Sequence, residues 1–335
     1  MLISLIVPIR NEQAGLDRFW QAITAVLEQT SYEFELVMVD DGSSDDSWRL
    51  ISEFTTTDRP SLHVAAIRLS RNFGKEAAIL AGLRQAEGSA AIVLDADLQH
   101  PPELIPKMLD LWDQGRTPIV EGVKRKRQHE SFMKRMGASL YYRIFSLSSG
   151  LDMQGASDFK LLDRRVMDQY INLPETDRYF RGLTAWMGFD AAAIEFEPPD
   201  REAGESGWSL HNLLALARST IISFSSLPLR IVTWLGVAGL IFSLALTIQT
   251  LWYKWMGFAE EGFPTVILLI LGIGSMILFS LGLIGEYIGE IYREVKRRPS
   301  YIVSETLSPS EHISQPSREQ SADVVTAQAH EEVRE

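Results

Sequence analysis

Residues 90–102 read Ala-Ala-Ile-Val-Leu-Asp-Ala-Asp-Leu-Gln-His-Pro-Pro. The first part of this stretch, Ala90–Leu94, is a short apolar run bounded by polar residues, which predicts a buried β-strand. Asp95 and Asp97 follow at the carboxyl end of that strand. Ligands of open α/β sheets bind beyond the carboxyl ends of the strands. The stretch therefore predicts both the class of the fold and the edge where its site lies.

The chain around this stretch alternates short apolar runs with helical patterns. Strands are expected at Ile3–Val7, Phe34–Val39, Val64–Leu69 and Ile119–Val123. Helices are expected at Gly15–Glu28, Asp45–Phe54, Lys75–Ala86 and Pro102–Trp112. Such alternation predicts an α/β fold of the Rossmann-like type, with a mostly parallel sheet covered by helices on both faces.

Polar residues also follow the other strands of the predicted sheet. The first strand ends in Pro8–Glu12, the second in Asp40–Asp45 and the third in Ser70–Lys75. A carboxylate after a nucleotide-binding strand commonly accepts hydrogen bonds from the ribose or base. We therefore expect Asp40 or Asp41 to face a nucleotide, while Ser43, Ser44 and Asp45 cap the following helix.

Asp95 and Asp97 have the spacing to hold a hard divalent cation together with substrate phosphates. Mg²⁺ or Mn²⁺ held there would neutralise the charge that builds on a departing nucleoside diphosphate. An Asp-x-Asp pair alone is common in surface turns, but its place at a strand end, with Gln99 following, favours a metal site. His100 precedes two prolines and is interpreted as a loop residue.

Composition excludes several classes of function. The formal net charge of -12 argues against a nucleic-acid partner. The chain contains no cysteine, which excludes a disulfide framework, a thiolate nucleophile and a Cys-ligated zinc site. Met1–Pro8 lacks the basic region and the cleavage site of a secretory signal.

Residues 231–251 and 265–284 are almost free of charge, and each is long enough to span a bilayer. We expect residues 229–290 to form a transmembrane hairpin, with interfacial aromatics at Trp234, Trp252, Tyr253 and Trp255. Basic residues flank the hairpin on its outer ends, at Arg230, Arg293, Lys296, Arg297 and Arg298. The positive-inside rule therefore predicts an integral membrane protein with its catalytic body and both termini in the cytoplasm.

Residues 131–147 place apolar side chains on one helical face and lie in a body that we assign to residues 1–208. The preceding basic run, Lys124–Arg127, favours an interfacial helix, because each such charge contributes about 1 kcal/mol near anionic lipid. An ordinary domain helix is the alternative. Residues 209–228 form a second candidate interfacial helix. Residues 299–335 are polar and predict a disordered cytoplasmic tail.

Four motifs in combination resemble the inverting family-2 glycosyltransferases with a GT-A fold: Val7–Glu12, Val39–Asp45, Arg71–Glu76 and Asp95–Glu103. Further matches lie at Ser157–Arg164 and Arg201–Ser206. The likeness is strongest to the polyprenyl-phosphate branch, which includes dolichol-phosphate mannose synthases and bacterial undecaprenyl-phosphate glucosyltransferases. It extends from Ile6 through the two spans.

The resemblance implies a role for each matching position. It implies a metal site at Asp95, Asp97 and Gln99. It implies a nucleotide pocket at Pro8, Arg10, Glu12, Asp40, Asp41, Lys75, Asp95 and Ala96. It places the acceptor phosphate at Lys124, Arg135 and Ser139, and an arginine on a mobile loop at Arg201. Many relatives carry a lysine on that loop where this chain has Gly207, which favours the glucosyltransferases over the mannose synthases.

Asp158 lies in a matching motif, and its role is open. Transfer to an alcohol needs a general base, whereas a phosphate monoester, with a second pKa near ~6, is already largely anionic at neutral pH. Asp158 is therefore a base, a group that positions the acceptor or the sugar, or a cap of the following element. Together with Asp97 and Arg201 it forms the predicted catalytic set.

The implied reaction transfers a hexose, glucose from UDP-glucose before mannose from GDP-mannose, to a polyprenyl phosphate with inversion. A processive polysaccharide synthase is a rival, but the chain has no Gln-x-x-Arg-Trp motif and two spans cannot form a polymer channel. An inactive membrane scaffold is the other rival, and the intact Asp95, Asp97 and Gln99 argue against it. Small residues in the second span, such as Gly272 and Gly282, are compatible with a homo-oligomer.

Overall fold

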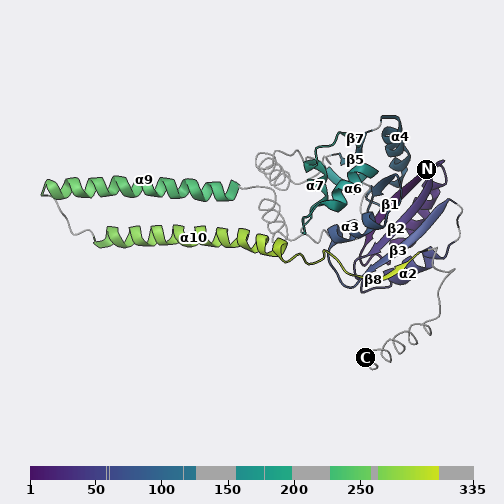
Figure 1. Cartoon of the computed structure of the whole chain (residues 1–335), viewed down its shortest axis with the longest axis horizontal. Helices are drawn as coiled ribbons and strands as arrows, with labels where there is room; N and C mark the ends of the chain where they lie inside the picture. Colours follow the sequence, from purple (N-terminus) through teal and green to yellow (C-terminus); the bar gives the residue numbers. More distant parts are fainter. Residues whose placement is uncertain are drawn as a thin grey trace, which may run out of the picture.

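The protein is described by a computed structural model that covers residues 1–57, 59, 61–115, 117–125, 156–176, 178–197, 227–257 and 263–308. These residues form a mixed α/β body and a long helical hairpin that extends away from it (Figure 1). The predicted interfacial helix at 131–147, residues 209–226 of its juxtamembrane counterpart and residues 309–335 of the tail lie outside the described residues.

The body is built on an eight-stranded sheet with the order β7-β5-β6-β4-β1-β2-β3-β8. Its strands are β1 (Leu2–Ile9), β2 (Glu33–Asp40), β3 (Leu62–Leu69), β4 (Ala90–Val93), β5 (Ile119–Lys124), β6 (Ala156–Asp163), β7 (Ala191–Phe196) and β8 (Val303–Leu307). β1 pairs in parallel with β2 and β4, β2 with β3, and β5 with β7. β6 runs antiparallel between β4 and β5, and β8 runs antiparallel to β3. The expected mostly parallel sheet is confirmed.

The helices cover both faces of this sheet. They are α1 (Leu16–Leu27), α2 (Ser47–Thr55), α3 (Lys75–Gln85), the 3₁₀ turn η1 (Pro102–Leu104), α4 (Ile105–Gly115), α6 (Arg164–Asn172) and α7 (Phe180–Trp186). The elements expected as far as residue 124 are all present, with bounds that shift by a few residues. β6, β7 and β8 are additional, because their short runs carry no clear alternation.

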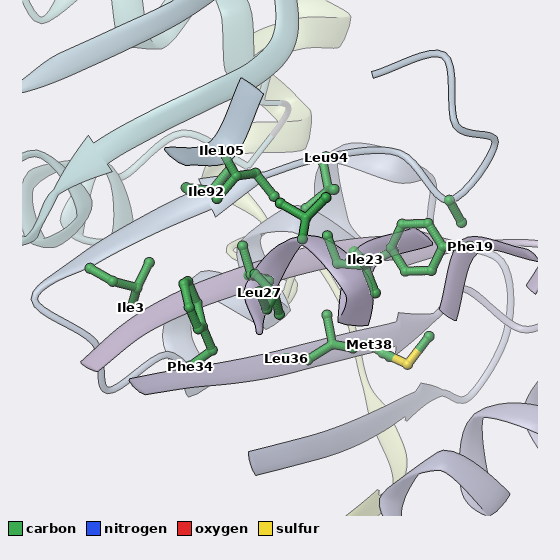
Figure 2. Packing of buried hydrophobic residues seen from close by; sticks show 14 of the residues in the cluster. Ile3, Phe19, Ile23, Leu27, Phe34, Leu36, Met38, Ile92, Leu94 and Ile105 are labelled. Atoms are coloured by element: carbon green, nitrogen blue, oxygen red, sulfur yellow. The ribbon is translucent and has the colours of Figure 1, made fainter. Parts of the chain in front are cut away.

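Successive side chains of the central strands point to opposite faces of the sheet and pack into two hydrophobic layers. Figure 2 shows the layer that includes Ile3, Leu36 and Ile92, packed against α1 and α4. The side chains on the other face of the sheet, such as those of Ile6 and Val37, pack against α3, α6 and α7. α3 lies close to the sheet because Gly82 faces it: a Cβ there would lie 2.3 Å from Cγ2 of Ile6.

The hairpin consists of α9 (Leu227–Trp255) and α10 (Phe263–Val295), which lie side by side in Figure 1. Val232–Trp255 and Gly272–Val295 are each long and apolar enough to cross a membrane, and in both windows no residue is buried inside the protein. The predicted hairpin of two long apolar helices is confirmed. α10 continues past the predicted end at residue 284, because no proline or helix-ending glycine interrupts it before Pro299.

Two expectations for the body are wrong. α2 is not capped by Ser43 or Ser44: its N-cap is Asp46, and Asp45 Oδ1 accepts the hydrogen bond from the Ser47 N–H instead. The tail is not disordered from residue 299 onward, since Val303–Leu307 pairs with β3. A polar segment can form an edge strand because its exposed side chains stay in water while its backbone completes the ladder.

Candidate functional site

A cleft of about 300 Å³ opens at the carboxyl ends of β1, β2 and β4. It is lined by Pro8, Ile9, Arg10, Glu12, Asp41, Gly74, Lys75, Asp95, Ala96 and Asp97. These residues come together because β1 lies between β2 and β4, so the loops that follow the strands meet at one edge. Seven of the eight residues predicted for the nucleotide pocket line the cleft, and Asp40 does not.

The first two loops of the cleft are joined by hydrogen bonds. Asn11 has a left-handed backbone, with φ of 54°, and its side-chain Oδ1 accepts the Ser44 N–H at 2.8 Å. In return, the Asn11 N–H donates to Ser43 Oγ at 3.0 Å, and the Glu12 N–H donates to Ser47 Oγ at 2.9 Å. The serines that were expected to cap α2 therefore brace the loop after β1.

The two aspartates at the end of β2 have different surroundings. Asp41 lines the cleft and accepts the N–H groups of Phe73 and Gly74 at 2.7 and 2.9 Å. Asp40 is fully buried: its Oδ1 accepts the Ser43 N–H, and its Oδ2 lies 3.4 Å from Arg68 Nε. Asp41 is thus the one placed to meet a ligand, while Asp40 lies beneath the loop.

Asp158 holds two cations at one end of the cleft. Lys75 Nζ lies 2.6 Å from both Asp158 Oδ2 and Asp95 Oδ1. Arg181 donates to both carboxylate oxygens of Asp158, at 2.6 and 2.8 Å. Burial alone would raise the pKa of Asp158, but the hydrogen bonds from Arg181 and the charge of Lys75 outweigh it and hold that pKa well below its usual range. An aspartate that is so strongly ionised is a weak proton acceptor.

Asp95 and Asp97 present oxygen ligands of the kind that Mg²⁺ and Mn²⁺ prefer. Asp97 Oδ1 also accepts the Gln99 N–H at 3.0 Å. The pKa of Glu12 is raised by burial and then by the charges of Asp97 and Asp95, so three carboxylates crowd this part of the cleft. No group of three or more metal-binding side chains is preformed in the described part of the chain. The donor set fits a cation that also takes substrate phosphates and water as ligands.

His100 lies in a loop, as predicted, and it is buried directly behind Asp95. Its Nδ1 accepts the Asp95 N–H at 3.1 Å, and its ring stacks on Phe159 with centroids 5.2 Å apart. Burial lowers the pKa of His100 to about 4, so the ring is neutral at neutral pH. His100 therefore fixes the backbone that presents Asp95. Its only sequence signal was its position five residues after Asp95.

Glu76 and Arg181 also belong to the site and were not identified from the sequence. Glu76 Oε2 accepts the Phe180 N–H at 2.8 Å and so holds the start of α7, next to Arg181. Burial, together with the charge of Asp158, raises the pKa of Glu76 to about 8. Glu76 lies in the motif Arg71–Glu76, from which only Lys75 is predicted as a site residue. Arg181 lies in none of the motifs that the sequence offers.

Only one of the three residues predicted for the acceptor phosphate is described. Lys124 ends β5, and its pKa is lowered by burial and then by the charge of Arg181. Arg135 and Ser139 lie outside the described residues, as do Arg201 and Gly207. Among the predicted catalytic residues, Asp97 lies in the cleft and Asp158 at its edge.

Comparison with known proteins adds two family matches. The family described as glycosyl transferase family 2 matches residues 4–170. The family described as the GtrB C-terminal hairpin matches residues 227–291.

Curated relatives match over nearly their whole length. The putative glycosyltransferase CsbB of Bacillus subtilis is 35% identical over 93% of this chain and 94% of its own. The SfII prophage-derived bactoprenol glucosyl transferase of Shigella flexneri is 34% identical over 91% of this chain and 98% of its own. Among solved structures, glucosyl-3-phosphoglycerate synthase from Mycobacterium tuberculosis matches with a TM-score of 0.43 and 17% identity, over 66% of this chain and 77% of that chain.

Proposed function

Because the chain belongs to glycosyl transferase family 2, we propose that it transfers glucose from UDP-glucose to undecaprenyl phosphate, with inversion at the anomeric carbon. The reaction would take place at the cytoplasmic face of the membrane, with both termini on that side. The observation that carries this proposal is that one chain combines a cleft in a family-2 domain with an apolar hairpin. The chain is also similar to a bactoprenol glucosyl transferase over nearly the whole length of that relative.

In this proposal the donor nucleotide lies in the cleft. Asp41 is held by two backbone N–H groups and accepts hydrogen bonds from the base or ribose. Arg10 and Lys75 line the same cleft and face the diphosphate as cations. Arg201 would add a further cation from its loop.

Asp95 and Asp97, with Gln99, would hold a divalent cation, which supplies charge neutralisation for the departing nucleoside diphosphate. The protein's own part is to present these oxygens. His100 fixes the backbone of Asp95, and Lys75 pairs with the Asp95 carboxylate.

The acceptor phosphate is its own nucleophile. One of its oxygens attacks the anomeric carbon while the bond from that carbon to the nucleoside diphosphate breaks on the opposite face, and the bonding pair leaves with the diphosphate. Because the phosphate is anionic at neutral pH, no proton has to be removed. Asp158 then acts by holding Arg181 and Lys75 in place, and Lys124, with Arg135 and Ser139, meets the acceptor phosphate.

A lipid-extraction assay tests the reaction. Purified protein is incubated with undecaprenyl phosphate, Mg²⁺ and a panel of labelled UDP- and GDP-sugars. The proposal expects label from UDP-glucose in the organic phase, lost in an Asp95→Ala/Asp97→Ala variant and kept in Asp110→Ala, which removes an exposed acid on α4.

Three other outcomes would each replace part of the proposal. Label from GDP-mannose alone would make the protein a mannosyltransferase, the alternative that the family likeness leaves open. Nucleotide binding without label from any donor would point to another acceptor or to an inactive scaffold. Label that persists after chelation of divalent cations would remove the metal from the proposal.

A further inference from the structure

The chain returns to the body after the hairpin along Glu294–Leu307, a segment that we call the strap. In Figure 1 the strap runs from the end of α10 to the outer edge of the sheet, where β8 lies beside β3. The Ile302 carbonyl accepts the Ser70 N–H at 2.8 Å, and the Arg84 guanidinium lies over the Tyr301 ring, 5.6 Å from its centroid. The membrane hairpin is thus tied to the body along a defined path.

The first residue of the strap makes a polar contact between hairpin and body. Glu294 accepts the Thr176 N–H with both carboxylate oxygens, at 2.9 and 3.1 Å. The Thr176 hydroxyl donates to Glu294 Oε2 at 3.0 Å. These bonds join residues 118 positions apart in the sequence. Hydrogen bonds to a charged acceptor are the stronger kind.

The position of Glu294 is unusual for an acid. It lies in the last turn of α10, where the helix dipole disfavours negative charge by up to about 1 kcal/mol. Its neighbours Arg293 and Lys296–Arg298 are basic, as expected beside anionic lipid headgroups. Attraction to lipid therefore does not explain a carboxylate here, and a carboxylate is suited to accept the hydrogen bonds from Thr176.

Thr176 lies in the connection between α6 and α7, close to the cleft. Arg178, two residues later, anchors this connection by donating to the carbonyls of Leu173 and Glu175. Phe180 and Arg181, which follow, bind Glu76 and Asp158.

A second cavity, of about 270 Å³, lies between this connection and the start of α3. Thr176, Arg178 and Ser300 line one part of it, and Gly74 and Lys75 line both this cavity and the nucleotide cleft. The contact between Glu294 and Thr176 is therefore separated from the nucleotide cleft by this second cavity.

We propose that Glu294 is a positioning residue, which clamps the α6–α7 connection to the end of the membrane hairpin and so holds the cleft at the height of a membrane-embedded acceptor phosphate. This inference rests on the proposed function. The lipid phosphate is confined to the headgroup layer, so the body must present its cleft at a set distance from the hairpin. Misplacement by about 1 Å can cost a reaction about 100-fold.

The test compares two acceptors in one preparation. Proteoliposomes carry wild type, Glu294→Ala, Glu294→Gln or Thr176→Val, and receive either embedded undecaprenyl phosphate or a water-soluble short-chain isoprenyl phosphate. We expect Glu294→Ala to lose about 10- to 100-fold in transfer to the embedded lipid and to keep its rate with the soluble acceptor. Glu294→Gln keeps an oxygen that accepts the Thr176 N–H and should be intermediate. Glu305→Ala, which removes an exposed acid on β8, should match wild type.

Two results would overturn the clamp: wild-type transfer to the embedded lipid by Glu294→Ala, or an equal loss with both acceptors. The second would mean that the contact shapes the Asp158–Arg181 ion pair at the cleft itself. A wild-type protein inactive with both acceptors would instead overturn the proposed function.

A distance measurement tests the clamp without activity. The chain has no cysteine, so spin labels attach only at Glu53→Cys on α2 and Gln249→Cys on α9. We expect one narrow distance distribution with Glu294 present and a broad one in Glu294→Ala. Identical distributions would overturn the clamp even if the protein were inactive.

Discussion

The body and the hairpin are built from the same apolar residue types, but they use them differently. In the body, Ile3, Leu36 and Ile92 are completely buried between sheet and helices. In the hairpin, the side chains of Ile241 and Leu278 are 63% and 71% exposed on the protein surface. The body is therefore stabilised by contacts within the chain, whereas the hairpin needs lipid to cover it. Within the described residues, the strap ties these two regions together through β8 and Glu294.

The largest difference between the two regions should appear in the free energy of unfolding when one isoleucine in each region is replaced by alanine. Ile92→Ala opens a cavity in the body and should lower the free energy of unfolding by about 2–5 kcal/mol. Ile277→Ala removes a side chain that is 54% exposed and should change it by less than about 0.5 kcal/mol in detergent. Denaturant unfolding in one detergent measures both, and equal losses would contradict the contrast.

A half-buried acid in the body should make its stability depend on pH. Glu76, with its pKa raised to about 8, is most favourable when protonated, so its contribution is complete below about pH 4.5 and is lost as pH rises toward 8. Glu76→Gln keeps an acceptor for the Phe180 N–H without that titration. Its free energy of unfolding should exceed that of wild type by roughly 2–4 kcal/mol at pH 8.5 and by little at pH 4.5.

The matched control for this prediction is Glu53→Gln, which alters an exposed acid on α2. The free energy of unfolding of Glu53→Gln should differ little from that of wild type at both pH 4.5 and pH 8.5. The groups around Glu76 that influence the result are Asp158, Lys75 and Arg181. A Glu76→Gln variant that parallels wild type across this range would show that Glu76 does not titrate there.

Breaking the ion pairs at the cleft should cost somewhat less. Asp158→Asn leaves Lys75 and Arg181 without their shared carboxylate, and both cations are about one-third exposed, which reduces the penalty. We expect a loss of roughly 2–3 kcal/mol in the free energy of unfolding at neutral pH, with transfer reduced as well.

The pKa of Asp158 is lowered, so its contribution to stability is complete above the ordinary aspartate pKa of about 4 and is lost only in strong acid. The difference between Asp158→Asn and wild type should therefore stay constant between pH 6 and 8. A rise in the wild-type transfer rate through this range that disappears in Asp158→Asn, and so does not come from ionisation of the acceptor phosphate, would instead identify Asp158 as a base.

The smallest expected effect lies where the two regions join. Tyr301→Leu removes the contact with the Arg84 guanidinium and should cost about 0.5–1 kcal/mol. Tyr301→Phe keeps the ring and should retain most of that energy. Thermal unfolding of the body distinguishes the two variants, and equal losses would show that the hydroxyl rather than the ring matters.

Local patterns were sufficient for elements whose neighbours lie close in the chain. Apolar runs such as Ala90–Leu94 predicted the central strands, and the charge-free stretches predicted the spans. Patterns failed where a partner lies far away. The polar strand β8 is recognisable only beside β3, and Ser43 and Ser44 bind the loop after β1 instead of serving as the predicted cap.

The sequence by itself determined the strands and helices as far as residue 124, the two long apolar helices and the carboxylates at one sheet edge. It could do so because hydrophobic periodicity and strand-end chemistry are properties of neighbouring residues. Only the tertiary structure decided that Asp158 meets Lys75, 83 positions away, that Glu76 holds α7, and that Glu294 binds Thr176 across 118 positions. These contacts depend on how β6, α7 and the strap pack against α3 and β3, and no local pattern records that packing.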